Sequence, residues 1–328
     1  MESLLEKIQE VYELKLEFVE KVTEGFLTEN YILAGGSTKY FLKKYRFKDA
    51  SKIREIHEAK KYFLVGGILV VTPISTSAGE SFFEYEGRFY TLFPFISDRQ
   101  LKDGQITEKA IVSLAQTLAR IHLLGRDAKI SIDKSFTGWD KQIRLKEIED
   151  ILQKISKIED KTGFDTSAEQ NLLLKKRIIE SNKQTYEQFS FRNDHLIHGD
   201  YMIGNVFFDA DDNVSYIFDF EKTQYAPRFF ELFRSMIYST FLGDNVTQDA
   251  LNLAKLYLNS YLAVYPMSKD ELVSGFTAYC LRSAHSLWVE KEHYLLGNTR
   301  VDELLQSDIL RTNYFSKHFE EMKEFLFK

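Results

Sequence analysis

Polar side chains that could handle a metal ion and a phosphate group flank two short apolar runs in residues 198–221, HGDYMIGNVFFDADDNVSYIFDFE. Asp and Asn residues in the range 209–213 separate these runs, and such clusters between β-rich segments are typical of turns. A hairpin whose turn is centred on Asp212 places Asn205 opposite Asp219, with their Cβ atoms about 5 Å apart. An amide oxygen and a carboxylate oxygen at that separation can share one Mg²⁺ ion, which keeps waters or phosphate oxygens as its other ligands.

Asp200 lies five residues before Asn205, which gives the spacing D-x-x-x-x-N ahead of the later D-F-E. Enzymes that transfer phosphoryl groups use this spacing for a catalytic carboxylate and a metal-binding Asn. Asp200 would accept the proton of a substrate hydroxyl and orient it for attack. Asn205 and Asp219 would hold a metal that offsets the charge developing on the phosphate. The pattern therefore predicts phosphoryl transfer to an alcohol.

Three other interpretations compete with this one. Strand ends and turns are often acidic, so Asp200 and Asp219 taken singly also fit solvated caps. The run D-A-D-D-N resembles the start of a calcium-binding loop, but Val214 stands where that loop requires Gly and Phe220 where it requires a bidentate Glu. His198 is a third candidate for a base. Because Asp200 already fills that position, we expect the His198 ring to shape the loop through hydrogen bonds to the backbone.

A lysine for the phosphates is expected on the strand predicted over 39–45. Lys43 and Lys44 point to opposite faces of that strand, and Lys43 follows an apolar pair as the lysine of V-A-I-K does. The helix predicted over 50–64 offers Glu58 as the carboxylate that positions Lys43. The competing interpretation is that both side chains belong to a solvated surface.

Two further segments bear on the nucleotide. EGFLTENY contains Gly25 alone and no G-x-G-x-x-G, so only the backbone amides of residues 24–29 are candidates for cradling phosphates. The segment LFPFI offers backbone groups of Pro94 and Ile96 to an adenine edge, with Pro94 able to accept a hydrogen bond but not to donate one. An ordinary strand end between two domains is the alternative interpretation for this segment.

Composition narrows the class of protein. The 328 residues are 44% hydrophobic and 28% charged, with a net charge of −6, which argues against a nucleic-acid binder. The apolar run at 62–71 is too short to span a membrane, and the charged N-terminus lacks the apolar core of a signal peptide. Cys280 is the only cysteine, which fits a reducing compartment. We expect a soluble cytoplasmic protein.

The order of elements predicts an α+β protein with two domains. A hairpin across Gly35-Gly36, the helix at 50–64 and strands at 68–71 and 89–93 form a small antiparallel-sheet domain with one main helix, residues 1–95. A larger, mostly helical domain, residues 96–328, follows the polar stretch after Pro94. Its helices are expected from their apolar period at 110–124 (ended by Gly125), 140–157, 249–264, 269–296 and 301–327.

Several of these segments resemble one family. HGDYMIGNVFFD followed by YIFDFE resembles the H-G-D-x-x-x-x-N-V-L-F and I-D-F-E elements of the aminoglycoside phosphotransferase and choline kinase-like superfamily. LAQTLARIHLLG, residues 114–125, resembles the helix of that family that ends in L-A-x-L-H, and YAPRFFEL, residues 225–232, resembles its segment after the metal-binding Asp. Glu231 departs from the pattern, because the family often has Asp there.

The resemblance implies a protein-kinase-like bilobal fold that uses ATP, or sometimes GTP, with Mg²⁺ and phosphorylates the hydroxyl of a small molecule. It implies Asp200 as the catalytic base and Asn205 and Asp219 as the metal ligands. It also implies Lys43 as the phosphate-binding lysine, with Glu58 as its partner.

The acceptor stays open between an aminoglycoside and a metabolite such as an amino alcohol, a sugar or homoserine. Trp288 and Tyr294, with Glu290 and Glu292 nearby, could receive a cationic acceptor; at helical spacing they also fit a core and a solvated face. A protein serine/threonine kinase is a second candidate, although no A-P-E-type segment follows Asp219. A nucleotide-binding module without activity is the third, and the Asp200 carboxylate argues against it.

Overall fold

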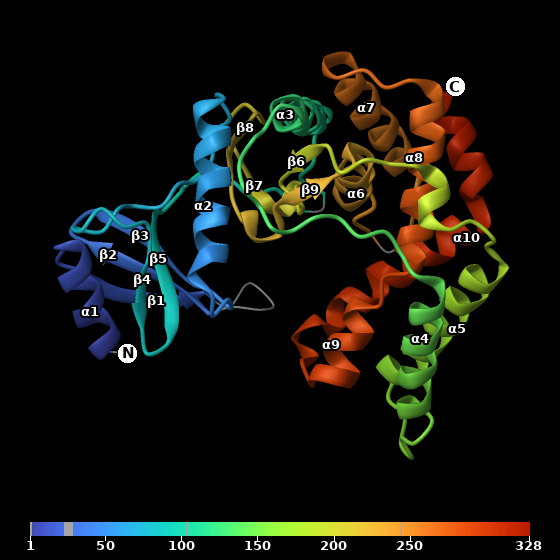
Figure 1. The fold of residues 1–328 in the computed structure, drawn as a ribbon, viewed down its shortest axis with the longest axis horizontal. Helices are drawn as coiled ribbons and strands as arrows, with labels where there is room; N and C mark the ends of the chain where they lie inside the picture. The colour runs from blue at the N-terminus through green and yellow to red at the C-terminus, as the bar shows by residue number, and fades with distance from the viewer. Residues whose placement is uncertain (1, 23–28, 103, 244) are drawn as a thin grey trace.

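The computed structural model describes residues 2–22, 29–102, 104–243 and 245–328. An antiparallel sheet with two helices forms one end of the molecule, and a larger helical region forms the rest (Figure 1). This mixed α+β architecture agrees with the expectation from the sequence. None of the helices in the described part of the chain is long and apolar enough to cross a membrane.

The sheet has five antiparallel strands in the order β1-β2-β3-β5-β4. Their bounds are Glu17–Val22 for β1, Asn30–Gly35 for β2, Thr38–Lys44 for β3, Phe83–Tyr85 for β4 and Arg88–Pro94 for β5. The predicted hairpin is present as β2 and β3, with Gly36 at a φ of 63° in its turn. The strand expected at 68–71 is absent: Val70 makes one isolated bridge, to Ile217.

Helix α1, Glu2–Tyr12, packs on the sheet and was not predicted. Leu4, Ile8 and Tyr12 are buried against strand residues such as Leu33. These three residues recur at every fourth position, which is the signal that the helical period provides. The tyrosine hydroxyl also accepts a hydrogen bond from the Leu92 backbone amide at 3.1 Å.

Helix α2, Ala50–Val65, stands between the sheet and the helical region (Figure 1). Asp49 caps its N-terminus by accepting a hydrogen bond from the Ser51 amide. Its buried face includes Ile53, Ile56, His57, Lys60 and Phe63. Two of these are polar, and both lie near the candidate site described below.

The helical region is built from α3 to α10 with four short strands between α5 and α6. The helices are α3 Glu108–Arg126, α4 Lys141–Ile155, α5 Gly163–Ser181, α6 Arg228–Thr240, α7 Gln248–Val264, α8 Lys269–Ala284, α9 Trp288–Leu296 and α10 Leu305–Phe327. The strands are β6 His195–Ile197, β7 Val206–Phe208, β8 Val214–Ile217 and β9 Gln224–Ala226. Strand β6 pairs with β9, and β7 pairs with β8.

Two sequence expectations about these helices are wrong in detail. The helix expected over 269–296 is two helices, α8 and α9, and the Ser286 carbonyl between them accepts a hydrogen bond from the buried Lys175 ammonium at 2.6 Å. Gly125 does not end α3, which continues to Arg126. A Cβ atom at Gly125 would lie 2.0 Å from the Leu196 carbonyl oxygen, so this glycine is required for the close contact between α3 and β6.

Candidate active site

The loop after β6 carries Asp200 and is shaped by His198. The Nε2 atom of this fully buried histidine bonds the Phe218 carbonyl at 2.8 Å, and its Nδ1 atom accepts a hydrogen bond from the Asp200 amide at 3.1 Å. Gly199 has a φ of 85°, and a Cβ there would lie 1.9 Å from the Lys222 carbonyl oxygen. The expected structural role of His198 therefore agrees with its contacts, and only glycine fits beside it.

Glu231 on α6 anchors this loop from behind. Its carboxylate accepts hydrogen bonds from the backbone amides of His198 at 3.1 Å, of Gly199 and of Tyr201 at 3.2 Å. His122 on α3 bonds the same carboxylate at 3.1 Å. Burial alone would raise the pKa of Glu231, but these hydrogen bonds outweigh burial and hold that pKa below its usual value. Glu231 thus positions the loop rather than a substrate, a role that the sequence left open.

Asp200 itself is held by two cations. Lys222 lies 2.9 Å from its Oδ2 atom, and the Arg234 guanidinium contacts Oδ1. Burial would raise the pKa of the Asp200 carboxyl, but the charges of Arg234 and Lys222 outweigh it and hold that pKa well below its usual range. The carboxylate is therefore ionised and fixed in direction, which suits it to orient a donor such as an alcohol.

The β7–β8 hairpin differs from its predicted register by one residue. Val206 pairs with Ile217, and the Phe218 amide donates to the Asn205 carbonyl at 3.1 Å. Asn205 therefore lies opposite Phe218, not Asp219. The difference arises in the turn, which is centred on Asp211 because Phe208 pairs with Val214. An irregularity between Phe207 and Phe208 then moves the register one residue towards the predicted one.

Asn205 and Asp219 are placed by other contacts. The Asn205 amide nitrogen donates to the Asp200 carbonyl at 2.8 Å, which turns its side-chain oxygen away from that carbonyl. Asp219 follows β8 with a φ of 60°, an uncommon conformation for a residue other than glycine. The Asn205 side chain thus links the two ends of the loop that begins at Asp200. The side chain of Asp219 is held near the site by a strained, left-handed backbone conformation.

Lys43 on β3 reaches across to the segment after β8. Its ammonium lies 2.7 Å from Asp219 and 2.7 Å from Glu221, and Glu221 also pairs with Arg46 at 3.3 Å. Burial alone would lower the pKa of Lys43, but the two carboxylates outweigh it and raise that pKa. Glu58 does not pair with Lys43. Its side chain is exposed on α2, and it is not among the residues that form the buried face of that helix.

The face of α2 that does point inward carries His57 and Lys60, which the sequence did not indicate as site residues. The Lys60 ammonium donates to the Val71 carbonyl at 2.8 Å and lies 4.4 Å from the ring centroid of Phe93. Burial and the nearby charge of Lys43 lower its pKa to about 7. His57 is also buried, and burial followed by repulsion from Lys60 lowers its pKa to about 3.

The remaining predicted positions are less constrained. Pro94 is exposed at the end of β5, opposite Tyr40, and Ile96 is half-buried two residues later. Both follow the sheet directly, at the connection to the helical region. Residues 24–28 of the phosphate-loop candidate lie outside the described residues.

The side chains considered for a cationic acceptor do not form one group. Glu290 is fully buried and pairs with Lys175 at 3.1 Å. The Tyr294 hydroxyl donates to Asp165 at 2.7 Å. Trp288 alone approaches the site, since the Lys222 ammonium lies 6.0 Å from its ring centroid.

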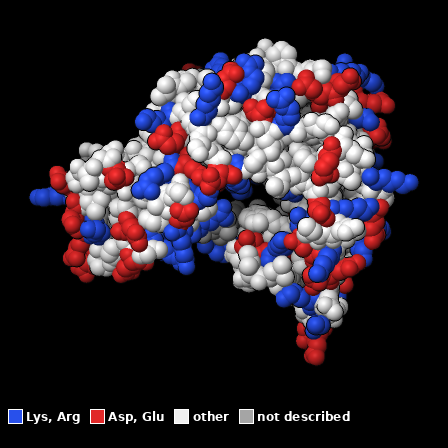
Figure 2. Space-filling view, viewed as in Figure 1, with Lys and Arg blue, Asp and Glu red and all other residues white. Residues whose placement is uncertain are grey.

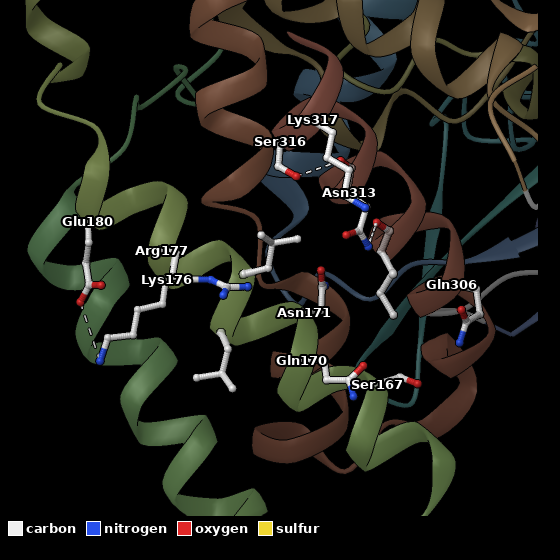
Figure 3. Close-up of a pocket in the computed structure, with 13 residues that line it drawn as sticks. Ser167, Gln170, Asn171, Lys176, Arg177, Glu180, Gln306, Asn313, Ser316 and Lys317 are labelled. Atoms are coloured by element: carbon white, nitrogen blue, oxygen red, sulfur yellow. Dashed lines mark hydrogen bonds and ion pairs between the residues drawn. The ribbon is translucent and has the colours of Figure 1, made fainter. Parts of the chain in front are cut away.

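The space-filling view shows the molecule hollowed between the sheet end and α9, with charged side chains along the edges of the hollow (Figure 2). A separate cavity of about 750 Å³ lies between α5 and α10 and is lined by polar side chains that include Gln170, Arg177 and Asn313 (Figure 3). None of the candidate site residues lines this second cavity. The candidate site residues therefore lie apart from this cavity, on the loop after β6 and on the strands around it.

Comparisons with known proteins identify solved structures that share this fold. Solved structures with the same fold include a spectinomycin phosphotransferase in complex with ADP and spectinomycin (TM-score 0.62, 18% identity, covering 99% of this chain and 97% of that one). A microcompartment-associated aminopropanol kinase gives a TM-score of 0.65 at 11% identity over 100% and 99% of the two chains. Choline kinase from Cryptosporidium parvum Iowa II gives a TM-score of 0.60 at 10% identity, covering 100% of this chain and 99% of that one.

These neighbours confirm the expected protein-kinase-like fold. None of the curated protein sequences compared with the chain matches it. The profile of the phosphotransferase enzyme family matches residues 19–266, a segment that contains the loop, both strand pairs and Lys43. The matched segment is well over half of this chain, so the chain belongs to the phosphotransferase enzyme family.

Proposed function

We propose that the protein transfers the γ-phosphoryl group of ATP, or of GTP, to a hydroxyl group of a small molecule. The observation that carries this proposal is that Lys43, from the sheet, meets the much later segment that contains Asp200, Asn205 and Asp219. Asn205 bonds the Asp200 backbone at 2.8 Å, and Asp219 pairs with Lys43 at 2.7 Å. The spectinomycin phosphotransferase was solved with ADP, and an amicoumacin kinase of the same fold with AMP-PNP and Ca²⁺.

The donor set suits a hard divalent cation. Asn205 and Asp219 offer an amide oxygen and a carboxylate, the ligand types that Mg²⁺ prefers. Among the described residues, no three His, Cys, Asp or Glu side chains are grouped so that they could hold a metal by themselves, which fits an ion that shares its coordination with phosphate oxygens. Bound Mg²⁺ would neutralise charge on the transferred phosphoryl group.

The chain's own residues then have separable roles. Asp200 accepts a hydrogen bond from the acceptor hydroxyl and aims its oxygen at the γ-phosphorus. Because its pKa lies well below that of an alcohol, Asp200 takes the proton only as the bond to phosphorus forms. Lys43 binds phosphate oxygens, and the backbone at Pro94 and Ile96 contacts the adenine edge. We accordingly assign nucleotide binding to residues 1–95 and acceptor binding to residues 96–328.

Two other functions receive less support. A protein kinase needs a segment that presents a peptide after the metal-binding Asp, but here β9 and α6 follow Asp219 within a few residues. A nucleotide-binding module without activity has no use for a buried, ion-paired carboxylate at Asp200. Neither alternative explains why the loop is anchored so firmly.

Asp200→Ala tests the proposal. We expect this variant to bind ADP as the wild type does and to lose phosphoryl transfer by a factor of about 10²–10⁴. Calorimetry measures the first quantity, and release of ADP with a panel of hydroxyl acceptors measures the second. Asp270→Ala, an exposed position on α8, is the matched control. Full transfer activity in Asp200→Ala would show that the assigned role is wrong.

A further inference from the structure

The acceptor hydroxyl must approach Asp200, whose carboxylate contacts two cations. Arg234 and Lys222 contact its two carboxylate oxygens. Lys134 is an exposed residue whose pKa is lowered by partial burial of its amino end and by repulsion from Lys222. An acceptor that reaches Asp200 therefore meets positive charge on the helical side of the site.

More positive charge lies beyond Arg234 along α6. The Arg234 guanidinium lies 4.6 Å from the ring centroid of Tyr238, one helical turn further on, and Arg311 from α10 lies 4.1 Å from the same centroid. Arg282 on α8 is close enough to Tyr238 and to Arg144 on α4 for their charges to affect it. We call Arg144, Arg234, Arg282 and Arg311 the arginine cluster.

Two members of the arginine cluster, Arg144 and Arg234, pair with carboxylates. No carboxylate in the described part of the chain pairs with Arg282 or Arg311, and the Nε atom of Arg282 is also buried without a hydrogen-bond partner. The Nε atom of Arg144 is buried in the same way, although another part of that guanidinium contacts Glu147. Buried donors without partners cost free energy, and two neighbouring guanidinium groups repel each other. A bound anion would relieve both costs.

We propose that the acceptor is anionic: an alcohol that carries a carboxylate or a phosphate group, with its hydroxyl at Asp200 and its acidic group at Arg282 and Arg144. This inference rests on the proposed kinase function and narrows the acceptor class. Guanidinium groups suit the task because their planar, forked donors match the oxygens of carboxylates and phosphates. A cationic acceptor would face the same groups with the wrong sign, and Glu290, which could have received it, is occupied by Lys175.

The nucleotide offers a different explanation for part of this charge. Lys222 and Arg234 lie at Asp200 itself, so they could also contact the transferred phosphoryl group. No hydrogen bond or ion pair in the described part of the chain joins Arg282 to a candidate nucleotide residue, and its charge interacts with Arg144 and Tyr238, so replacing it separates the two explanations. Loss of a contact to the acceptor raises the KM for the acceptor, and loss of a contact to the nucleotide raises the KM for ATP.

The experiment uses two acceptor series in which the hydroxyl groups are similar and the charge differs. The first is glucose, glucuronate, glucose 6-phosphate and glucosamine, and the second is glycerol, glycerate and 1-amino-2-propanol. Binding to the full chain saturated with ADP is measured by calorimetry, and transfer from ATP is measured for every compound that binds. We expect the acidic members to bind at least about tenfold more tightly than the neutral and amine members. Glucuronate against glucose 6-phosphate distinguishes carboxylate from phosphate recognition.

Variants of Arg282 complete the test. Arg282→Gln should weaken binding of the acidic compounds about tenfold or more, with the affinity for ADP unchanged, and Arg282→Lys should restore part of the loss. Arg177→Gln, which removes the same charge from the distant cavity between α5 and α10, should have no effect. Preference for the amines, failure of every acidic member to bind, or an unchanged affinity in Arg282→Gln would each overturn the inference. Failure of the kinase proposal is recognised separately, by an ADP affinity or an ATP turnover that is absent in the wild type.

Discussion

Replacing Glu231 with Ala removes the acceptor that three backbone amides and one histidine share. Those donors belong to His198, Gly199, Tyr201 and His122, and Glu231 is fully buried. An alanine methyl group cannot accept a hydrogen bond, so the substitution leaves these buried N–H groups without their side-chain acceptor. Each such loss costs about 1–3 kcal/mol, and deleting one partner of a buried charged network typically costs about 3–5 kcal/mol.

We therefore expect Glu231→Ala to lower the free energy of unfolding by about 4 kcal/mol, a large part of the roughly 5–15 kcal/mol that holds a typical fold together. Activity should fall as well, because a displacement of about 1 Å at a catalytic group costs on the order of 10²-fold. Glu231→Asp keeps the charge but shortens the reach, and it should fall between the wild type and the Ala variant in both quantities.

Urea unfolding followed by tryptophan fluorescence measures stability, and ADP release under saturating acceptor measures kcat. The expected loss corresponds to a shift of the urea midpoint on the order of 1 M. Glu324→Ala is the control, since it removes an exposed ion pair with Lys328 that is worth about 0–1 kcal/mol. If Glu231→Ala unfolds at the same urea concentration as this control, the anchoring role assigned to Glu231 is wrong.

Three further predictions concern packing and pH. Gly125→Ala should lower the free energy of unfolding by about 1–3 kcal/mol, because the new methyl group would lie 2.0 Å from the Leu196 carbonyl oxygen; urea unfolding at the wild-type midpoint would contradict this. His57 stays neutral in the fold, where its pKa is lowered to about 3 from 6.5. Below pH 6.5 the unfolded chain therefore binds one more proton than the fold, and the free energy of unfolding decreases as the pH is lowered. His57→Gln should remove about 1.4 kcal/mol per pH unit of this loss between pH 6 and 4, as urea titrations at several pH values would measure. Lys60, with a pKa of about 7 against 10.5 when unfolded, binds a proton more readily in the unfolded chain, so wild-type stability should rise from pH 7 towards pH 10. Lys60→Met should abolish that rise, and a variant that kept it would place the titrating group elsewhere.

The sequence indicated the family and the segment that carries the candidate site because the residues of that segment are close together in the chain. Asp200, Asn205 and Asp219 lie on one loop and one hairpin, so their spacing alone restricts where they can be. The β2–β3 hairpin and α2 were predicted for a similar reason, since a Gly-Gly turn and a capped apolar period are local signals.

Tertiary contacts decided the features that the sequence could not supply. Glu58 was a reasonable partner for Lys43 by distance along the chain, but the phase of α2 turns Glu58 to solvent and His57 and Lys60 inward. The hairpin register differs by one residue because the turn is centred on Asp211 rather than Asp212, and an irregularity after Phe207 corrects only part of that difference. Glu231 could not be assigned a role until α6 was placed behind the loop.

The anchoring of the loop by Glu231 and His122 has a consequence for how this enzyme could change over time. Glu231 and His122 contact the loop from α6 and α3, whereas the residues proposed to bind the acidic group, Arg282 and Arg144, lie on α8 and α4. Under that proposal, substitutions at Arg282 or Arg144 would change the choice of acceptor and leave the support beneath Asp200 intact. Such a separation lets a single scaffold diversify its substrates while its phosphate chemistry is preserved.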